Sequence, residues 1–173
     1  LPIFDDVFDV APNVHQIPNN VLLNSSQYQE TNWSGNNSSI YCSGGRFYDI
    51  KENHIDGYET GIQCNRIRNT HITDNNIVNC HFYGIYLNTV RNTKTSCNVI
   101  NMEAQYHLNS VGIGYFTNKN TYGNSIISNC IFETNTAMHY ESVNGPDQVL
   151  PRIYNNYLYN FIYRTFYIFR NIF

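Results

Sequence analysis

Two groups of residues in this sequence could do acid–base chemistry, and the first is a pair of carboxylates. Glu52 and Asp74 each stand one position before an Asn within similar six-residue stretches. Glycoside hydrolysis uses two carboxyl groups about 5 to 9.5 Å apart, so these two residues are the candidate catalytic pair. The alternative is a solvated turn, because Lys51 and Arg68 are near enough in sequence to neutralise the pair.

The second group is an imidazole beside a carboxylate. His139 stands two positions before Glu141 in "AMHYES". The pair could transfer a proton, but a single His–Glu pair on a strand is more often structural. Lyase chemistry of the pectate type would also need several acidic Ca²⁺ ligands and a basic group. The sequence does not supply such a set here, so we expect neither a metal nor another cofactor, and whether the protein is an enzyme stays open.

A sequence repeat built around Asn indicates the secondary-structure elements that position these residues. The pattern Ile-x-x-Asn-x-Ile occurs three times, and two looser copies complete the series. The Asn positions of the five copies are Asn53, Asn75, Asn98, Asn129 and Asn156, and they are 22, 23, 31 and 27 residues apart. Self-similarity at this period is typical of stacked repeat architectures. We therefore expect the five Asn side chains to form one inward ladder at a single corner.

A second pattern keeps phase with the first. The stretches "GIQC", "GIYL", "GIGYF", "AMHY" and "TFYIF" begin 8, 9, 14, 8 and 9 residues after the successive Asn positions. The apolar residues in these stretches alternate, which is the period of a strand and not of a helix. The bias of an Asn-rich, low-complexity chain is the alternative explanation, but it does not account for this second pattern.

Short strands with Asn or Gly at the corners, in coils of about 22 to 28 residues, indicate an all-β parallel β-helix with three strands per coil. Coils stack at about 4.8 Å, so successive carboxamides can bond to each other. A Gly fits a corner that a Cβ would crowd. Cys64 falls at an inward strand position, so among the five Cys we expect buried free thiols in preference to disulfides.

These repeats resemble the right-handed parallel β-helix superfamily of pectate lyases, polygalacturonases and bacteriophage tailspikes. The resemblance covers residues 38–173 and implies a solenoid of about five to six coils. It identifies the fold more strongly than the activity, because one fold hosts many functions. Among these proteins the chain is most similar to a tailspike β-helix.

The chain divides into two regions. Residues 1–37 contain three of the five Pro and no Asn pattern, so we expect an N-terminal arm or cap. Residues 38–173 form the β-helix domain, interrupted by loops at 101–110 and 141–151. The closing run "FIYRTFYIFRNIF" is too short and too charged to cross a membrane, and it fits a last coil. Natural solenoids cap such an end, so we expect a longer chain or a covering partner subunit.

Composition narrows the partners. The net charge is -3 with 13% charged residues, and the ten Lys and Arg are spread thinly. This pattern argues against nucleic-acid binding. Asn accounts for about one residue in six and Tyr for 15 residues, well above ordinary usage. Surfaces that are polar without being charged suit neutral polar ligands such as sugars.

The candidate binding residues are those expected to point outward on the strand after each Gly. They form two columns across the coils, and the candidates are Gln63, Tyr86, Asn88, His139, Glu141 and Tyr167. Aromatic rings can stack on sugar rings while amides bond to hydroxyls. Exposed rings of this kind could instead belong to a subunit interface, as in a homotrimer.

The sequence therefore predicts polysaccharide recognition by a β-helix. The predicted setting is a phage tailspike or another virion-associated receptor-binding protein, located outside the cell or on the virion. The first alternative is a secreted polysaccharide lyase or glycoside hydrolase. The second is a structural β-helix shaft without a ligand.

Overall fold

The computed structural model describes residues 15–23, 38–103, 109–117, 121–142, 151–159 and 164–170. The predicted loops at 101–110 and 141–151 and the closing run of the chain lie partly outside these ranges. All secondary structure in the described part of the chain is β-strand. Among these residues, no helix has the length and hydropathy to span a membrane.

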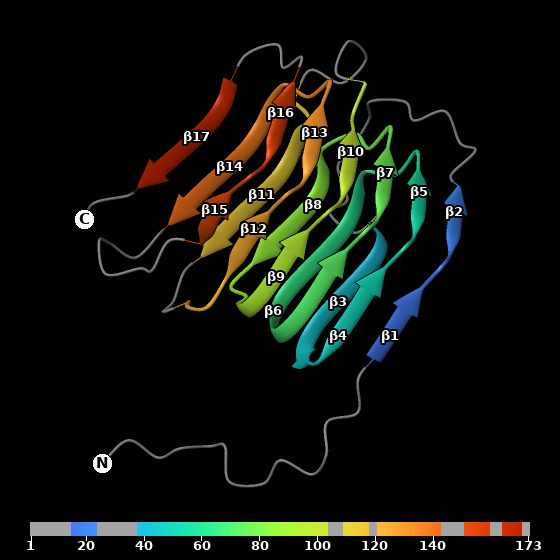
Figure 1. Cartoon of the computed structure of the whole chain (residues 1–173), viewed down its shortest axis with the longest axis vertical. Helices are drawn as coiled ribbons and strands as arrows, with labels where there is room; N and C mark the ends of the chain where they lie inside the picture. The colour runs from blue at the N-terminus through green and yellow to red at the C-terminus, as the bar shows by residue number, and fades with distance from the viewer. Residues whose placement is uncertain are drawn as a thin grey trace, which may run out of the picture.

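Three stacks of strands form three faces along the chain (Figure 1). The first face contains β3 (Ser38–Arg46), the start of β6 (Thr60–Thr73), β8 (Tyr83–Asn88), β11 (Val111–Thr117), β14 (Thr136–Ser142) and β17 (Arg164–Arg170). The second face contains β1 (His15–Pro18), β4 (Tyr48–Lys51), the end of β6, β9 (Arg91–Ser96), β12 (Ser125–Ile127) and β15 (Arg152–Tyr154). The third face contains β2 (Val21–Leu23), β5 (His54–Asp56), β7 (Asn76–Val78), β10 (Val99–Asn101), β13 (Cys130–Phe132) and β16 (Tyr157–Tyr159).

The strand pairing confirms the predicted parallel β-helix. Every strand pair is parallel, and each strand inside a stack pairs with its equivalents one coil earlier and one coil later. The first and second faces belong to one 11-stranded sheet because β6 runs through both, and the third face is a separate 6-stranded sheet. The strands complete about five turns of a solenoid.

Two strands of the solenoid lie before residue 38. β1 pairs with β4 and β2 pairs with β5, so both continue the stacks of the second and third faces. The segment 1–37 is described only at residues 15–23. Its role as an arm or cap therefore stays a prediction.

Columns of apolar side chains, many of them Ile, fill the interior. On the third face Ile55, Ile77 and Ile100 stack in register, each with no exposed surface. Ile62, Ile85 and Ile113 form a similar column on the first face, and β-branched side chains suit such a pleated surface.

All five Cys are free thiols, as predicted, and Cys42, Cys64 and Cys80 are buried in this core. The expected burial is wrong for the other two, because Cys97 is exposed and Cys130 is half-buried.

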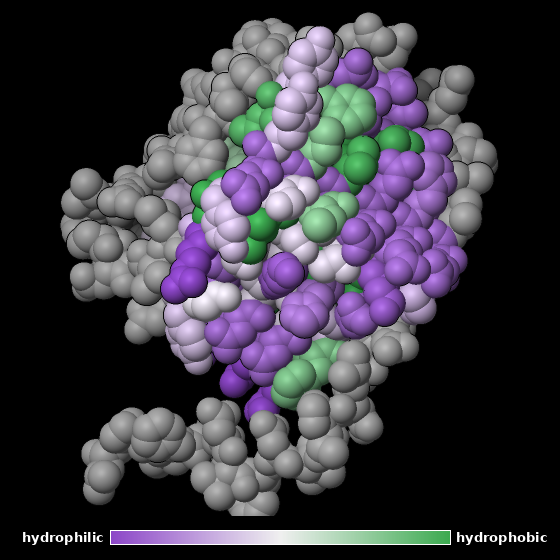
Figure 2. Space-filling model, viewed as in Figure 1, coloured by the Kyte–Doolittle hydropathy of each residue, from purple (hydrophilic) through white to green (hydrophobic). Residues whose placement is uncertain are grey.

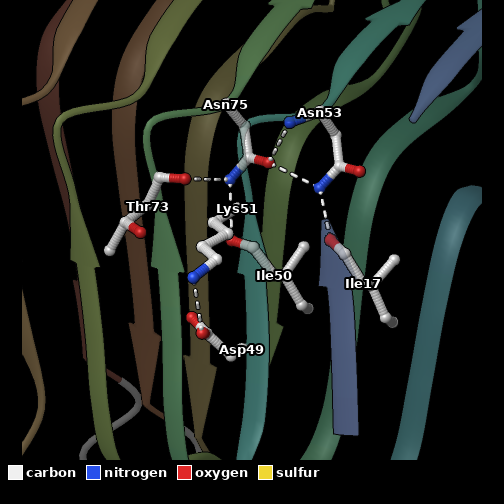
Figure 3. Close-up of polar contacts among 7 residues, drawn as sticks. All are labelled: Ile17, Asp49, Ile50, Lys51, Asn53, Thr73 and Asn75. Carbon is white, nitrogen blue, oxygen red and sulfur yellow. Dashed lines mark hydrogen bonds and ion pairs between the residues drawn. The ribbon is translucent and has the colours of Figure 1, made fainter. Parts of the chain in front are cut away.

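The Asn ladder lies inside the corner between the second and third faces, as predicted (Figure 3). The Asn75 carboxamide donates to Asn98 Oδ1 at 2.9 Å and to the Ile50 carbonyl at 3.0 Å, and its Oδ1 accepts from Asn53 Nδ2 at 2.8 Å. The same pairing joins Asn98 to Asn129 and Asn129 to Asn156, at 2.9 Å each. Backbone N–H groups of the corner also donate to these oxygens, so the ladder satisfies buried main chain as well.

The prediction that residues 1–37 lack the Asn pattern is wrong. Asn20 donates from its backbone N–H and from Nδ2 to Asn53 Oδ1, at 3.1 and 2.9 Å, and so adds a sixth member to the ladder. The stretch from Ile17 to Leu22 in fact follows the looser Ile-x-x-Asn-x-Leu pattern. Its distance of 33 residues from Asn53 places it beyond the period of the other copies.

Glycine allows the first face to pack closely on the third. A Cβ at Gly84 would lie 2.6 Å from Ile100 Cγ2 and 2.8 Å from the Gly112 carbonyl oxygen. Gly61 would meet the Gly84 carbonyl oxygen at 2.6 Å in the same way. The expected crowding is therefore present, and it comes from neighbouring coils.

Candidate functional site

Strand register brings the predicted binding residues together on the outer surface of the first face. Gln63, Tyr86, Gly114, His139 and Tyr167 occupy one register position in successive strands. Asn88 and Glu141 belong to the second register position, with Phe116 between them. The backbone of Tyr167 pairs with that of His139, but its side chain is outside the described part of the structure.

Four rings pack against one another on this surface, and we call them the aromatic strip: Tyr83, Tyr86, Phe116 and His139. The rings of Tyr86 and Phe116 are stacked, with centroids 4.9 Å apart and planes inclined by 26°. Phe116 continues to His139 at 5.1 Å, and Tyr83 meets Tyr86 edge-on at 5.0 Å. The strip therefore crosses three coils, from β8 through β11 to β14.

Tyr83 is a member that the alternating pattern did not identify. Its ring lies against the outward position of the next coil, where a Cβ on Gly114 would come within 2.7 Å of Tyr83 Cε1. The absence of a side chain at Gly114 therefore makes room for this ring. A Gly at an outward strand position beside several aromatic residues is the sequence signal that could have indicated it.

Polar groups surround the strip. His139 Nε2 lies 3.7 Å from Glu141 Oε2, and the two side chains keep 21% and 32% of their surface exposed. The Ser38 hydroxyl donates to Gln63 Oε1 at 2.7 Å, and the Thr89 hydroxyl donates to Asn88 Oδ1 at 3.0 Å. These contacts orient the amides at the border of the rings.

The environment keeps the phenols of the strip neutral. Burial raises the pKa of Tyr83 to about 12, and the Tyr86 and Glu141 side chains add to the shift. Burial also raises the pKa of Tyr86, again with a contribution from the Glu141 carboxylate. Both hydroxyls are therefore hydrogen-bond donors at physiological pH.

The carboxylates predicted as a catalytic pair lie elsewhere. Glu52 and Asp74 occupy equivalent positions in adjacent coils, at the corner between the second and third faces, and both are exposed. Each has a φ of 57°, in the left-handed region, and immediately precedes a ladder Asn. The nearby Lys51 pairs with Asp49 at 3.3 Å (Figure 3). The structure thus assigns both residues a place in a tight corner away from the aromatic strip, and their catalytic role stays a prediction.

Metal-binding groups do not gather in the described ranges: there, no cluster of three or more His, Cys, Asp or Glu could hold a metal ion. On the face shown in Figure 2, hydrophilic residues form a broad band, with hydrophobic ones in a smaller area beside it. The rings, amides and hydroxyls of the first face offer ring stacking and hydrogen bonding, and His139 and Glu141 add one His–Glu contact.

Comparison of the chain with protein-family models, with curated proteins and with solved structures finds no match.

Proposed function

We propose that the first face of the solenoid recognises a polysaccharide through the aromatic strip. The observation that supports this most directly is the stack of Tyr86, Phe116 and His139 on three successive coils. Because the ring faces pack on one another, it is the outer edges of the stack that give the C–H face of a sugar ring an apolar surface to contact. The strip lies on a sheet whose register fixes the spacing of its members, so the surface needs little ordering when it binds.

Polar groups beside the rings would bind the hydroxyls of the same sugar. Gln63 and Asn88 offer amides, Glu141 offers an acceptor, and Tyr83 and Tyr86 offer neutral hydroxyls. Hydrogen bonds of this kind select among sugars while the rings supply the contact area. Binding would need no metal.

The setting that we propose is extracellular, in a phage tailspike or another virion-associated receptor-binding protein. A parallel β-helix with an aromatic outer face that carries few charges suits that role. A homotrimer is part of this proposal. The strip and a subunit interface are competing uses of the same surface, so the experiment has to separate them.

The test is retention on a panel of immobilised bacterial surface polysaccharides, combined with detection of released oligosaccharides. We expect the wild-type chain to be retained by at least one polysaccharide, and Tyr86→Ala to weaken retention at least tenfold. The matched control is Tyr157→Ala, because Tyr157 is a 63% exposed Tyr on the third face. Its retention should equal that of the wild type.

Three outcomes would contradict the proposal. Equal retention of wild type and Tyr86→Ala, together with a change of oligomeric state in sedimentation, would identify the strip as a subunit interface. No retention of any variant would leave a structural shaft. Release of oligosaccharides that is lost in Glu141→Gln, or in Glu52→Gln and Asp74→Asn, would show that the protein is an enzyme and locate its carboxylates.

A further inference from the structure

Arginine side chains gather at the corner between the first and second faces. Arg46, Arg68 and Arg91 occupy one register position in three successive coils. Neighbouring strands in a sheet are about 4.8 Å apart, so the three side chains leave the backbone close together. Arg66 stands two residues before Arg68 at the same corner.

The backbone explains why these side chains point outward. Arg66 and Asn69 have φ values of 54° and 51°, and the equivalent Thr89 and Asn92 have 55° and 48°. Each pair of left-handed residues bends the chain twice, with two residues between the bends. One of these faces the core, since Ile67 and Val90 have no exposed surface. The second residue between the bends is Arg68 in one coil and Arg91 in the next, and it points outward.

A pocket of about 190 Å³ lies at this corner, lined by Arg66, Ile67, Arg68, Thr89 and Arg91. Arg91 is held on one side because its guanidinium carbon lies 5.7 Å from the centroid of the Tyr122 ring. Such a cation–π contact restricts the guanidinium without neutralising it. The pocket therefore has one positioned Arg and two exposed ones.

Within the described residues, no carboxylate forms an ion pair with Arg66, Arg68 or Arg91. The pocket lining contains no acid, and Asp49 on the second face is paired with Lys51. Like charges at such short range destabilise a protein, although solvent screens part of the repulsion. A cluster of three guanidinium groups around a hollow is stabilised when an anion occupies it.

We propose that this arginine corner binds a doubly charged tetrahedral oxyanion, a phosphate or a sulfate group. The guanidinium group presents planar pairs of N–H donors that match two oxygens of such a group at once. A dianion neutralises more of the charge of Arg66, Arg68 and Arg91 than a carboxylate can. The site is independent of the aromatic strip, and it stands whether or not the first face binds sugars.

The test is calorimetric titration of the whole chain with inorganic phosphate at constant ionic strength. We expect one saturable site. Arg68→Gln and Arg91→Gln should each weaken phosphate binding about tenfold or more, the loss of one charge-assisted hydrogen-bonded contact. Arg152→Gln is the matched control, because Arg152 is an exposed Arg on β15, the last described strand of the second face. It should bind as the wild type does.

Three results would overturn the proposal: no saturable phosphate binding, an equal loss in Arg152→Gln, or equal affinity for acetate. Competition with a phosphorylated and a sulfated sugar monoester then identifies the source of the group. Displacement of phosphate by an ester shows that the corner takes the group on a larger molecule. Binding of the inorganic ions alone shows that it takes the free anion, and either result upholds the oxyanion site.

Discussion

Replacing Asn75 by Leu should destabilise the fold by more than any change at the solvent-exposed side of the same corner. Asn75 is 1% exposed, and its Oδ1 accepts from Asn53 N at 3.1 Å and from Asn53 Nδ2 at 2.8 Å. Leu has nearly the same shape but cannot accept. The Asn53 N–H would then be buried without the acceptor that it has in the structure.

The size of the effect follows from which groups keep a partner. Asn53 Nδ2 still donates to the Ile17 carbonyl at 2.8 Å, and Asn98 Oδ1 still accepts the backbone N–H of residue 75 at 3.1 Å. Asn53 Nδ2 and Asn98 Oδ1 therefore each lose one hydrogen bond to the residue 75 side chain but keep another. The Asn53 N–H loses its acceptor, which costs about 1 to 3 kcal/mol, and the weakened bonds raise the total to about 2 to 4 kcal/mol.

Urea unfolding of Asn75→Leu and of Asn76→Leu measures this difference. Asn76 is the adjacent exposed Asn and makes one exposed contact, with His54 Nδ1 at 3.1 Å. Its replacement should change the free energy of unfolding by no more than about 0.5 kcal/mol. Equal midpoints for the two variants would refute the reasoning, because the ladder would then contribute no more than a surface side chain.

Three further predictions concern the core. Gly84→Ala should lower the free energy of unfolding by about 1 to 3 kcal/mol, because the added Cβ is crowded. Ala137→Gly, at the equivalent position of another coil, should lower it by only about 0.5 to 1 kcal/mol. Equal losses in urea unfolding would contradict the close packing at Gly84. Burial raises the pKa of Cys80 and of Tyr115 to about 12 each. Because these folded-state pKa values lie above the unfolded ones, the two groups stabilise the folded protein fully below pH 9, and this stabilisation is lost as the pH rises toward 12. The urea midpoint should therefore fall over that range, and Tyr115→Phe should make the fall less steep. With a thiol reagent, the exposed Cys97 and the half-buried Cys130 should react in the native protein, whereas the buried Cys42, Cys64 and Cys80 should react only on unfolding. A fast phase that survives in the double variant Cys97→Ser/Cys130→Ser would contradict the assigned burial.

Much of the fold was predictable because a solenoid repeats one local rule. The Asn and Gly patterns keep phase along the chain, so the ladder and the outward columns follow from spacing alone. The sequence prediction missed Asn20 because a longer insertion separates it from Asn53, although the residues around Asn20 fit the looser pattern. A copy of the repeat whose spacing is longer than the usual period is therefore missed by a search on spacing, although the residues around its Asn still match the pattern.

The candidate surfaces were less predictable, because an alternating pattern says which side of a strand a residue faces and not where its ring lies. Tyr83 reaches the strip across Gly114, which only the packing of neighbouring coils reveals. The arginine corner shows the same limit. Arg and Lys are thinly spread along the chain, but "RNT" recurs at Arg68 and Arg91 with the period of the ladder, and the coil brings the two together.

The location of bound sugar tests the central claim most directly. The measurement is the change in NMR resonances of the whole chain when an oligosaccharide of the polysaccharide retained best is added. We predict that the largest changes fall on Tyr83, Tyr86, Phe116 and His139, while Tyr157 and Tyr159 on the third face stay unchanged. Changes centred on the third face, with the aromatic strip unaffected, would contradict the claim that the first face is the binding surface.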